Sequence, residues 1–515
     1  DSCRWLDALK AIDPILSSGS ACVEDWLFTG QVLIKVREYA QAAQVLQEGL
    51  RLQPDHLELQ YELAISLFQL GNVPAASRIL EELAQRSGML PAWRSLATII
   101  PGCPTANNAK VLKIRRQFVA QLLGSSNSPT SPTGTLDWER KQVGPAMAMR
   151  KSLPDRRIRL GYISAFFHRA NYMKPVWGLI NSHDRRRFDV ELFADDCRTD
   201  QFDWFRPGLQ DRFHITSQLN NNALGNLIRE RQLDIAIDLN AYSVAPRLEL
   251  YTQRLAPSVV AWFNLYATSA LPGIDWIVGD QYVIRGDEDA DYTERVFRLP
   301  YSYLSFVVGH QAPDVVPPPC LNNEYFTFGS LVSQYKITPT VLDAWSEILS
   351  RVQRSRLLIA NRAMQSTMNR EYLISEFAQR GVSDRQLILL PPADHFEYLR
   401  YYNQIDLALD AFPYNGGTTT TESIWQGVPV LTFDGDRWAA RTSRTLLMNC
   451  HLKEFVSPDR QAWIEAAVRW ATDENSPHRL TEIRSSMREQ LLESDVCQMP
   501  LMVQAMEEFF QSIAG

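Results

Sequence analysis

The sequence predicts a helical-repeat domain followed by two α/β domains. Three observations support this prediction. A helical repeat occupies Asp25–Leu83, strand-length and helix-length patterns alternate from Arg157 onward, and the Pro-rich stretch Pro313–Pro319 divides that alternation into two parts. Strands that alternate with helices form a parallel sheet with helices on both faces. A chain of 515 residues is also too long for a single core.

The repeat in the front of the chain has small residues where two helices must pack closely. The residues with the spacing of a tetratricopeptide helix pair are Trp26, Gly30, Ala42, Leu46 and Pro54, followed about 34 residues later by Gln60, Ala64, Ala76 and Leu80. The second copy lacks the Trp and the Pro. Stacked pairs of this kind present a concave surface that holds a protein or peptide. A helical spacer without a ligand fits the pattern equally well.

A connecting region follows the repeats. Ala106–Leu123 has the pattern of an amphipathic helix, and Ser125–Thr135 has the Ser, Pro and Thr content of a linker. We therefore predict four regions: residues 1–104 for the repeats, 105–155 for the connecting helix and linker, 156–312 for the first α/β domain, and 313–515 for the second.

Buried apolar runs predict the strands of both α/β domains. In the first domain these runs are Ile158–Ser164, Phe188–Phe193, Leu233–Leu239, Val259–Phe263 and Trp276–Val278. In the second domain they are Tyr325–Ser330, Arg356–Ala360, Leu387–Leu390, Leu407–Phe412 and Val428–Phe433. The predicted helices are Leu224–Gln232, Thr338–Arg351, Asn369–Arg380, Phe396–Asn403 and Gln461–Thr472, and Pro477–Ile513 is also predicted to be helical. Ligands of such sheets bind at the loops that follow the strands.

The stretch Asp406–Phe433 contains the clearest candidate site. An apolar strand is broken by Pro413, and a short helical segment begins near Glu422. The residues between them that would bind phosphate are Asn415, Gly416, Gly417, Thr418, Thr419 and Thr420. Glycines allow close backbone approach, and N–H groups at a helix start favour an anion. A purely structural interpretation stays open, because Thr419 and Glu422 also have the spacing of a capping box.

Further candidates lie near this stretch. Lys336 lies between a strand and a helix, two residues after Gln334, and would direct its ammonium at a phosphate bound at the Thr418 helix start. His395 and Tyr398 precede the stretch at the sheet edge where a nucleoside would lie. Tyr398 would stack on a pyrimidine, or else be a surface aromatic residue. Glu422 would bind ribose hydroxyls, or only cap its helix.

Two residues of the first α/β domain are candidates for a general base. Asp238 ends the third predicted strand, and His168 lies in the loop after the first. Both also have a structural interpretation, since an acid at a strand end and a lone histidine are commonly structural. The leaving phosphate itself is a third candidate for the base.

Composition limits the classes of function. The net charge of −7 and the absence of a basic block argue against nucleic-acid binding. The sequence has no apolar run of membrane-spanning length, and its seven cysteines are scattered without CxxC pairs. These features predict a cytoplasmic protein with reduced thiols. No metal-binding motif is recognisable, so we expect neither a metal nor a cofactor.

Four stretches resemble the O-GlcNAc transferase family, which includes the SPINDLY-type proteins. They are Arg159–Ser164 with Phe188–Val190, Asp238–Asn240 with Arg247 and Arg254–Pro257, Tyr335–Pro339, and Asp406–Pro429. The resemblance extends from Ile158 to the C-terminus. It implies a GT-B fold of two Rossmann-like domains behind tetratricopeptide repeats. It also implies inverting, metal-independent transfer of a sugar, usually GlcNAc from UDP-GlcNAc, to Ser or Thr of a protein held by the repeats and the interdomain cleft.

The resemblance assigns roles to several residues in the second α/β domain. Lys336 matches the family's diphosphate-binding lysine. Thr418, Thr419 and Glu422 match positions that bind phosphate and ribose, and His395 matches a basic residue that contacts ribose. The nucleotide-binding half of the family pattern is therefore intact.

The loops of the first α/β domain depart from the family. The family's active-site histidine falls at Ala170, its Asn-Gly-Tyr becomes Asn240-Ala241-Tyr242, and its Gly-Tyr-Pro-Gly-Thr becomes Asn264–Thr268. Gly417 occupies the position of a phosphate-loop histidine. These departures leave three alternatives open: another sugar such as glucose or fucose, an Asn acceptor, or a non-catalytic scaffold that senses a nucleotide sugar.

Overall fold

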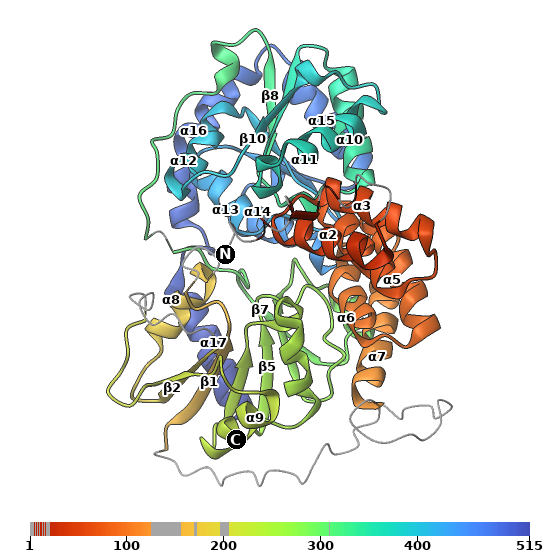
Figure 1. The fold of residues 1–515 in the computed structure, drawn as a ribbon. Helices are drawn as coiled ribbons and strands as arrows, with labels where there is room; N and C mark the ends of the chain where they lie inside the picture. Colours follow the sequence, from red (N-terminus) through yellow and green to blue (C-terminus); the bar gives the residue numbers. More distant parts are fainter. Residues whose placement is uncertain are drawn as a thin grey trace. The chain divides into compact units, whose positions relative to one another are not determined.

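The computed structural model of the protein forms two compact units (Figure 1). It describes residues 21–124, 156–168, 173–195, 205–307 and 309–514, with scattered positions between 5 and 16. The repeat-containing unit comprises Asp1–Ala106, His310–Leu447 and Leu452–Gln490. The seven-stranded unit comprises Asn107–Gly309, Met448–His451 and Leu491–Gly515. The predicted linker Ser125–Thr135 lies outside the described residues.

The front of the repeat-containing unit is a stack of antiparallel helices. These are α2 (Val23–Lys35), α3 (Tyr39–Leu52), α4 (Leu57–Gln69), α5 (Val73–Ser87) and α6 (Leu90–Ile99), followed by the short 3-10 helix η1 (Ile100–Gly102). The small residues lie where the repeat predicts. Ala42, Ala64 and Ala76 are fully buried, and a Cβ at Gly30 would lie 2.4 Å from Leu46 Cδ2. The predicted close packing of helix pairs is confirmed.

The same unit contains a six-stranded parallel sheet. Its strand order is β10-β9-β8-β11-β12-β13. The strands are β8 (Phe326–Ser330), β9 (Ser355–Ala360), β10 (Leu387–Leu390), β11 (Leu407–Leu409), β12 (Val430–Phe433) and β13 (Val456–Ser457). Its helices are α10 (Pro339–Arg351), α11 (Thr367–Ala378), α12 (His395–Arg400), α13 (Thr418–Trp425), α14 (Thr442–Asn449), α15 (Arg460–Thr472) and α16 (Ser476–Glu493), of which α14 and α16 each continue past this unit's boundary. β8 and β11 are central neighbours, so the loops that follow them lie side by side.

The seven-stranded unit is built on a second parallel sheet. Its strand order is β3-β2-β1-β4-β5-β6-β7. The strands are β1 (Ile158–Ser164), β2 (Phe188–Ala194), β3 (Arg212–Ile215), β4 (Ile235–Asp238), β5 (Ser258–Trp262), β6 (Trp276–Asp280) and β7 (Arg295–Leu299). The sequence did not predict β3 and β7. Both are edge strands, and their partly exposed charged side chains hide the apolar pattern.

Helices of the seven-stranded unit come from distant parts of the chain. They are α7 (Asn108–Gly124), α8 (Lys174–Ser182), α9 (Asn221–Glu230) and α17 (Met499–Ile513). The last helix returns to this sheet: Phe509 stacks on Phe297 at 4.0 Å, and Glu507 accepts a hydrogen bond from the backbone N–H of Asp184. The domain boundaries predicted from the sequence placed residues 313–515 in one domain, whereas Leu491–Gly515 belongs to the seven-stranded unit. Contacts made at such sequence separation leave no local pattern to predict them.

No described helix is long and apolar enough to cross a membrane.

Candidate functional site

The structure brings Lys336 and the glycine loop together. Lys336 ends the 3-10 helix η6 (Gln334–Lys336) that follows β8, and the loop 410–417 follows β11. The Lys336 ammonium donates a 2.6 Å hydrogen bond to the carbonyl oxygen of Asn415 and lies 4.1 Å from the centre of the Tyr414 ring. The positive charge of Lys336 is therefore held beside the loop.

Helix α13 begins directly after this loop. Its N-cap is Gly417, and no side chain caps it, so the capping box of Thr419 and Glu422 is not formed. The first intrahelical donor is Thr420, which bonds to the carbonyl of Gly417. The backbone N–H groups of Thr418 and Thr419 have no acceptor among the described residues. They are positioned to bind an anion, which the helix dipole also favours.

Two further features of the loop suit a close ligand. The side-chain oxygen of Asn415 is buried and accepts no hydrogen bond from any described residue. A Cβ at Gly416 would lie 2.5 Å from Thr419 Oγ1 and 2.7 Å from Thr420 Oγ1. Glycine at 416 therefore lets the backbone fold tightly onto the threonine hydroxyls.

Asp410 and Ser443 brace the loop, and sequence reasoning missed both. The buried Asp410 carboxylate accepts hydrogen bonds from the N–H of Gly416 (3.0 Å) and the hydroxyl of Thr432 (2.8 Å). Ser443 bonds to Thr420 Oγ1 (2.8 Å) and to the carbonyl of Gly416 (3.2 Å). An acid directly after the strand was the available signal for Asp410. Ser443 gives no signal in the sequence, because only the fold brings α14 to this loop.

Replacing Asp410 by asparagine is expected to weaken UDP binding about tenfold, because charge-assisted hydrogen bonds that shape the loop are lost. Titration calorimetry with UDP measures the effect. Asp384→Asn, at an exposed carboxylate of the same unit, is the matched control and should leave the affinity unchanged. Equal affinities of the two variants would show that Asp410 does not support the loop.

Burial lowers the pKa of Lys336 to about 8, against the opposing attraction of the Asp410 carboxylate. Near neutral pH the lysine is therefore mostly protonated and only partly hydrated. Desolvation disfavours its charge until an anion arrives. The same burial strengthens the attraction to a bound phosphate.

His395 and Glu422 come together beside α13. His395 Nε2 lies 2.9 Å from a carboxylate oxygen of Glu422, which is 4% exposed. The His395 ring also packs on His310, with 4.7 Å between ring centres. The pair joins the start of α12 to α13 and presents polar groups at the carboxyl edge of the sheet.

Tyr398 and Gln334 use their polar atoms within the fold. The Tyr398 hydroxyl donates to the carbonyl of Leu331 at 2.7 Å, and its ring packs against the core of the six-stranded sheet. The Gln334 amide donates to the carbonyl of Leu70 at 3.2 Å and accepts from Asn361 at 3.4 Å. These contacts favour a supporting role for both residues.

The candidate bases lie in the seven-stranded unit. Asp238 is 1% exposed, and its carboxylate accepts from the N–H groups of Asn240 and Ala241 and from the Tyr251 hydroxyl. Burial raises the pKa of Asp238 to about 6. Its acceptor sites are occupied by the turn after β4, which favours a structural role. His168 lies in the partly exposed turn after β1.

The altered loops of this unit differ in how far they change the backbone. Ala241, at the family's glycine position, adopts φ of +45°, a conformation that glycine adopts most readily. The backbone at this position therefore has a conformation that is also open to glycine. Tyr266, at the family's proline position, adopts φ of +58°, which proline cannot adopt. The loop 264–268 therefore has its own conformation.

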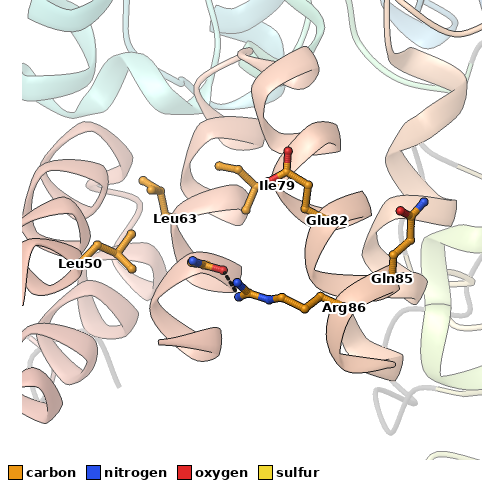
Figure 2. Close-up of a pocket in the computed structure, with 7 residues that line it drawn as sticks. Leu50, Leu63, Ile79, Glu82, Gln85 and Arg86 are labelled. Atoms are coloured by element: carbon orange, nitrogen blue, oxygen red, sulfur yellow. Dashed lines mark hydrogen bonds between the residues drawn. The ribbon is translucent and has the colours of Figure 1, made fainter. Parts of the chain in front are cut away.

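The helical front contains a groove of about 660 Å³. It is lined by residues of α3, α4 and α5, among them Leu50, Leu63, Ile79, Glu82, Gln85 and Arg86 (Figure 2). Its lining includes both apolar side chains and charged ones. Arg86 is held by a 3.0 Å hydrogen bond to the side chain of Gln60.

In the described part of the chain, no three His, Cys, Asp or Glu side chains are grouped as metal ligands.

Helical repeats followed by two parallel-sheet α/β domains are the architecture of GT-B glycosyltransferases. The family model described as "Glycosyl transferase family 41" matches residues 143–313 and 320–506, and a tetratricopeptide-repeat model matches residues 33–100. The chain belongs to glycosyl transferase family 41. The resemblance to O-GlcNAc transferases and the glycosyltransferase class are thereby confirmed.

Several relatives carry related names. The probable UDP-N-acetylglucosamine–peptide N-acetylglucosaminyltransferase SPINDLY of Solanum lycopersicum is 29% identical over 369 residues, 70% of this chain and 39% of that protein. The corresponding SEC protein of Arabidopsis thaliana is 27% identical over 345 residues, 64% of this chain and 35% of that protein. The chain thus spans under two fifths of the length of these curated relatives. A mutant O-GlcNAc transferase of Thermobaculum terrenum has the same fold, with a TM-score of 0.82, 26% identity, and coverage of 100% of this chain and 95% of that one.

Proposed function

We propose that this protein transfers a sugar, GlcNAc in the first instance, from a UDP-sugar to a Ser or Thr hydroxyl of a protein, with inversion and without a metal. The observation that carries the proposal is the Lys336 ammonium beside the Asn415–Gly417 loop and the open N–H groups of α13. The family and the names of the relatives support the donor and the protein acceptor.

In the proposed reaction the acceptor hydroxyl oxygen attacks the anomeric carbon of the sugar. The bond from that carbon to the β-phosphate oxygen breaks, and its electron pair leaves with UDP. Lys336 and the N–H groups of Thr418 and Thr419 stabilise the charge that grows on the diphosphate. His395 and Glu422 are proposed to contact the ribose.

The proton of the acceptor hydroxyl needs a base. The burial and hydrogen bonds of Asp238 argue against it, and we propose the departing phosphate, with His168 as the side-chain alternative. A phosphate base needs no side chain at the family's histidine position, which is Ala170 here.

We propose that the acceptor polypeptide is held by the helical front. The groove over α3, α4 and α5 is lined by apolar side chains and by the charged Glu82 and Arg86, which suits a peptide with mixed side chains (Figure 2).

UDP affinity is expected to fall as pH rises above about 8, by about tenfold for each further pH unit. The reason is that Lys336 attracts the diphosphate only in its protonated form. The pKa of Lys336 lies below its ordinary value, so the loss begins well before the usual range of a lysine. Calorimetric titration with UDP between pH 7 and about 9.5 measures it. An affinity that stays constant over this range would contradict the role of Lys336.

A donor screen tests the proposed function. The protein is incubated without metal with UDP-GlcNAc, UDP-glucose, UDP-galactose or GDP-fucose, while its melting temperature and the release of nucleotide are followed. We expect UDP-GlcNAc to raise the melting temperature and to release UDP when acceptor protein is present. Turnover with a different donor would correct the sugar. Binding of UDP without turnover of any donor would favour the nucleotide-sugar-sensing scaffold.

A further inference from the structure

The helical front touches the turn that carries Lys336. This turn, η6, follows β8 and packs against the end of α4. The Phe68 ring stacks on the Tyr335 ring, with centres 5.1 Å apart and planes inclined by 24°. The carbonyl of Leu70 accepts the hydrogen bond from the Gln334 amide. Phe68 in the last turn of α4 and Leu70 just after it thus contact Tyr335 and Gln334, the two residues that precede Lys336.

Gly71 brings the two backbones into direct contact. It lies in the turn between α4 and α5 with φ of +95°. A Cβ at this position would lie 2.2 Å from the carbonyl oxygen of Ile337 and 3.0 Å from that of Gln334. Only glycine leaves room for this approach, and carbonyl oxygens of the main chain cannot rotate out of the way.

The partner loop of Lys336 is held by the front as well. Tyr414, whose ring lies under the ammonium, would be 3.3 Å from a Cβ at Gly102 of η1. Arg437 donates to the carbonyl of Cys103 at 3.2 Å. Arg437 precedes the 3-10 helix η10 (Trp438–Ala440), in which the carbonyl of Ala439 accepts from the N–H of Asn415. Both sides of the phosphate-type site therefore rest on helical repeats.

We propose that the α4–α5 turn of the helical front, through Phe68, Leu70 and Gly71, positions the Lys336 turn for the diphosphate of the donor. The inference rests on the proposed function and extends it: the repeats are part of the donor site as well as a surface for a partner. Phe68, Leu70 and Gly71 are positioning residues, because they act only through Gln334, Tyr335 and Lys336. Holding the lysine in place before the ligand arrives reduces the ordering that binding requires.

Gly71→Ala tests the proposal, with Gly88→Ala as the matched control. Gly88 ends α5 with φ of +67°, and a Cβ there would have nothing within 4 Å. Both variants place alanine in a left-handed conformation, but only Gly71→Ala pushes on the Lys336 turn. We expect Gly71→Ala to weaken UDP binding about tenfold and Gly88→Ala to change it less than about twofold.

A double-mutant cycle shows whether the effect passes through the lysine. Once Lys336→Ala has removed the ammonium, adding Gly71→Ala should weaken UDP binding by less than about twofold more. The pH above which UDP affinity falls should also be higher in Gly71→Ala than in the unchanged protein. A loosened turn lets water reach the ammonium, which raises the pKa of Lys336. A merely destabilised protein would show neither behaviour.

Phe68→Leu keeps the test valid if Gly71→Ala does not fold. It removes the ring stack while keeping an apolar side chain, and Phe28→Leu at the exposed face of α2 is its control. We expect weaker UDP binding in Phe68→Leu only, with melting temperatures measured for both. The proposal would be overturned if each variant bound UDP as tightly as its control. It would also be overturned if the variant weakened UDP binding by the same factor with and without Lys336→Ala. If Lys336→Ala itself leaves UDP affinity unchanged, the proposed function fails at this site instead.

Discussion

Replacing Lys336 by alanine is expected to lower kcat/KM for sugar transfer by about 10²–10³-fold, the usual effect of removing one preorganised group that stabilises a leaving charge. The ammonium lies 2.6 Å from the carbonyl oxygen of Asn415, in the loop that leads to the open N–H groups at the start of α13. The melting temperature should change little, because the side chain is only partly buried. Nucleotide release with UDP-GlcNAc and an acceptor protein measures the loss.

Lys453→Ala is the matched control, since Lys453 is an exposed lysine of the same unit. It should transfer sugar at the rate of the unchanged protein. Lys336→Arg should recover only part of the activity, because the guanidinium is larger than the space between Asn415 and Tyr414 that the ammonium fills. Full activity in Lys336→Ala would remove Lys336 from the mechanism.

Replacing Arg115 by methionine is expected to destabilise the seven-stranded unit by about 3 kcal/mol, which for a domain of this size lowers the melting temperature by roughly 6–12 °C. Arg115 is 1% exposed and lies 3.8 Å from the centre of the Tyr242 ring. It donates to the carbonyl of Thr268 at 2.6 Å and to that of Ala267 at 3.3 Å. Methionine fills similar space but leaves these buried carbonyls without their donor.

The control for this variant is Lys113→Met, at an exposed position of the same helix α7. Calorimetric melting of both variants separates the buried contacts from the general effect of losing a positive charge. The loop 264–268 has its own backbone conformation, and Arg115 fixes its carbonyls. A melting temperature of Arg115→Met equal to that of Lys113→Met would show that the loop holds its shape without Arg115.

The sequence predicted the strands at the centres of both sheets because their apolar runs are continuous. It also predicted that Lys336 and the threonine-rich stretch meet, since both follow strands of one sheet. Asp410 and Ser443 were missed, because their role arises from hydrogen bonds across the loop rather than from spacing. The contact of Gly71 with Ile337 was equally hidden: a glycine at a helix end is common, and only the folded chain shows what approaches it.

The most direct test of the central claim, that this loop holds the diphosphate of a nucleotide sugar, is calorimetric titration of the full chain with UDP, UMP and uridine. We expect affinity to rise with each phosphate, and uridine to bind at least about 100-fold more weakly than UDP, because the attraction comes from Lys336 and the start of α13. In Lys336→Ala most of this difference should disappear. Equal affinity for UDP and uridine, or no binding of UDP, would contradict the claim.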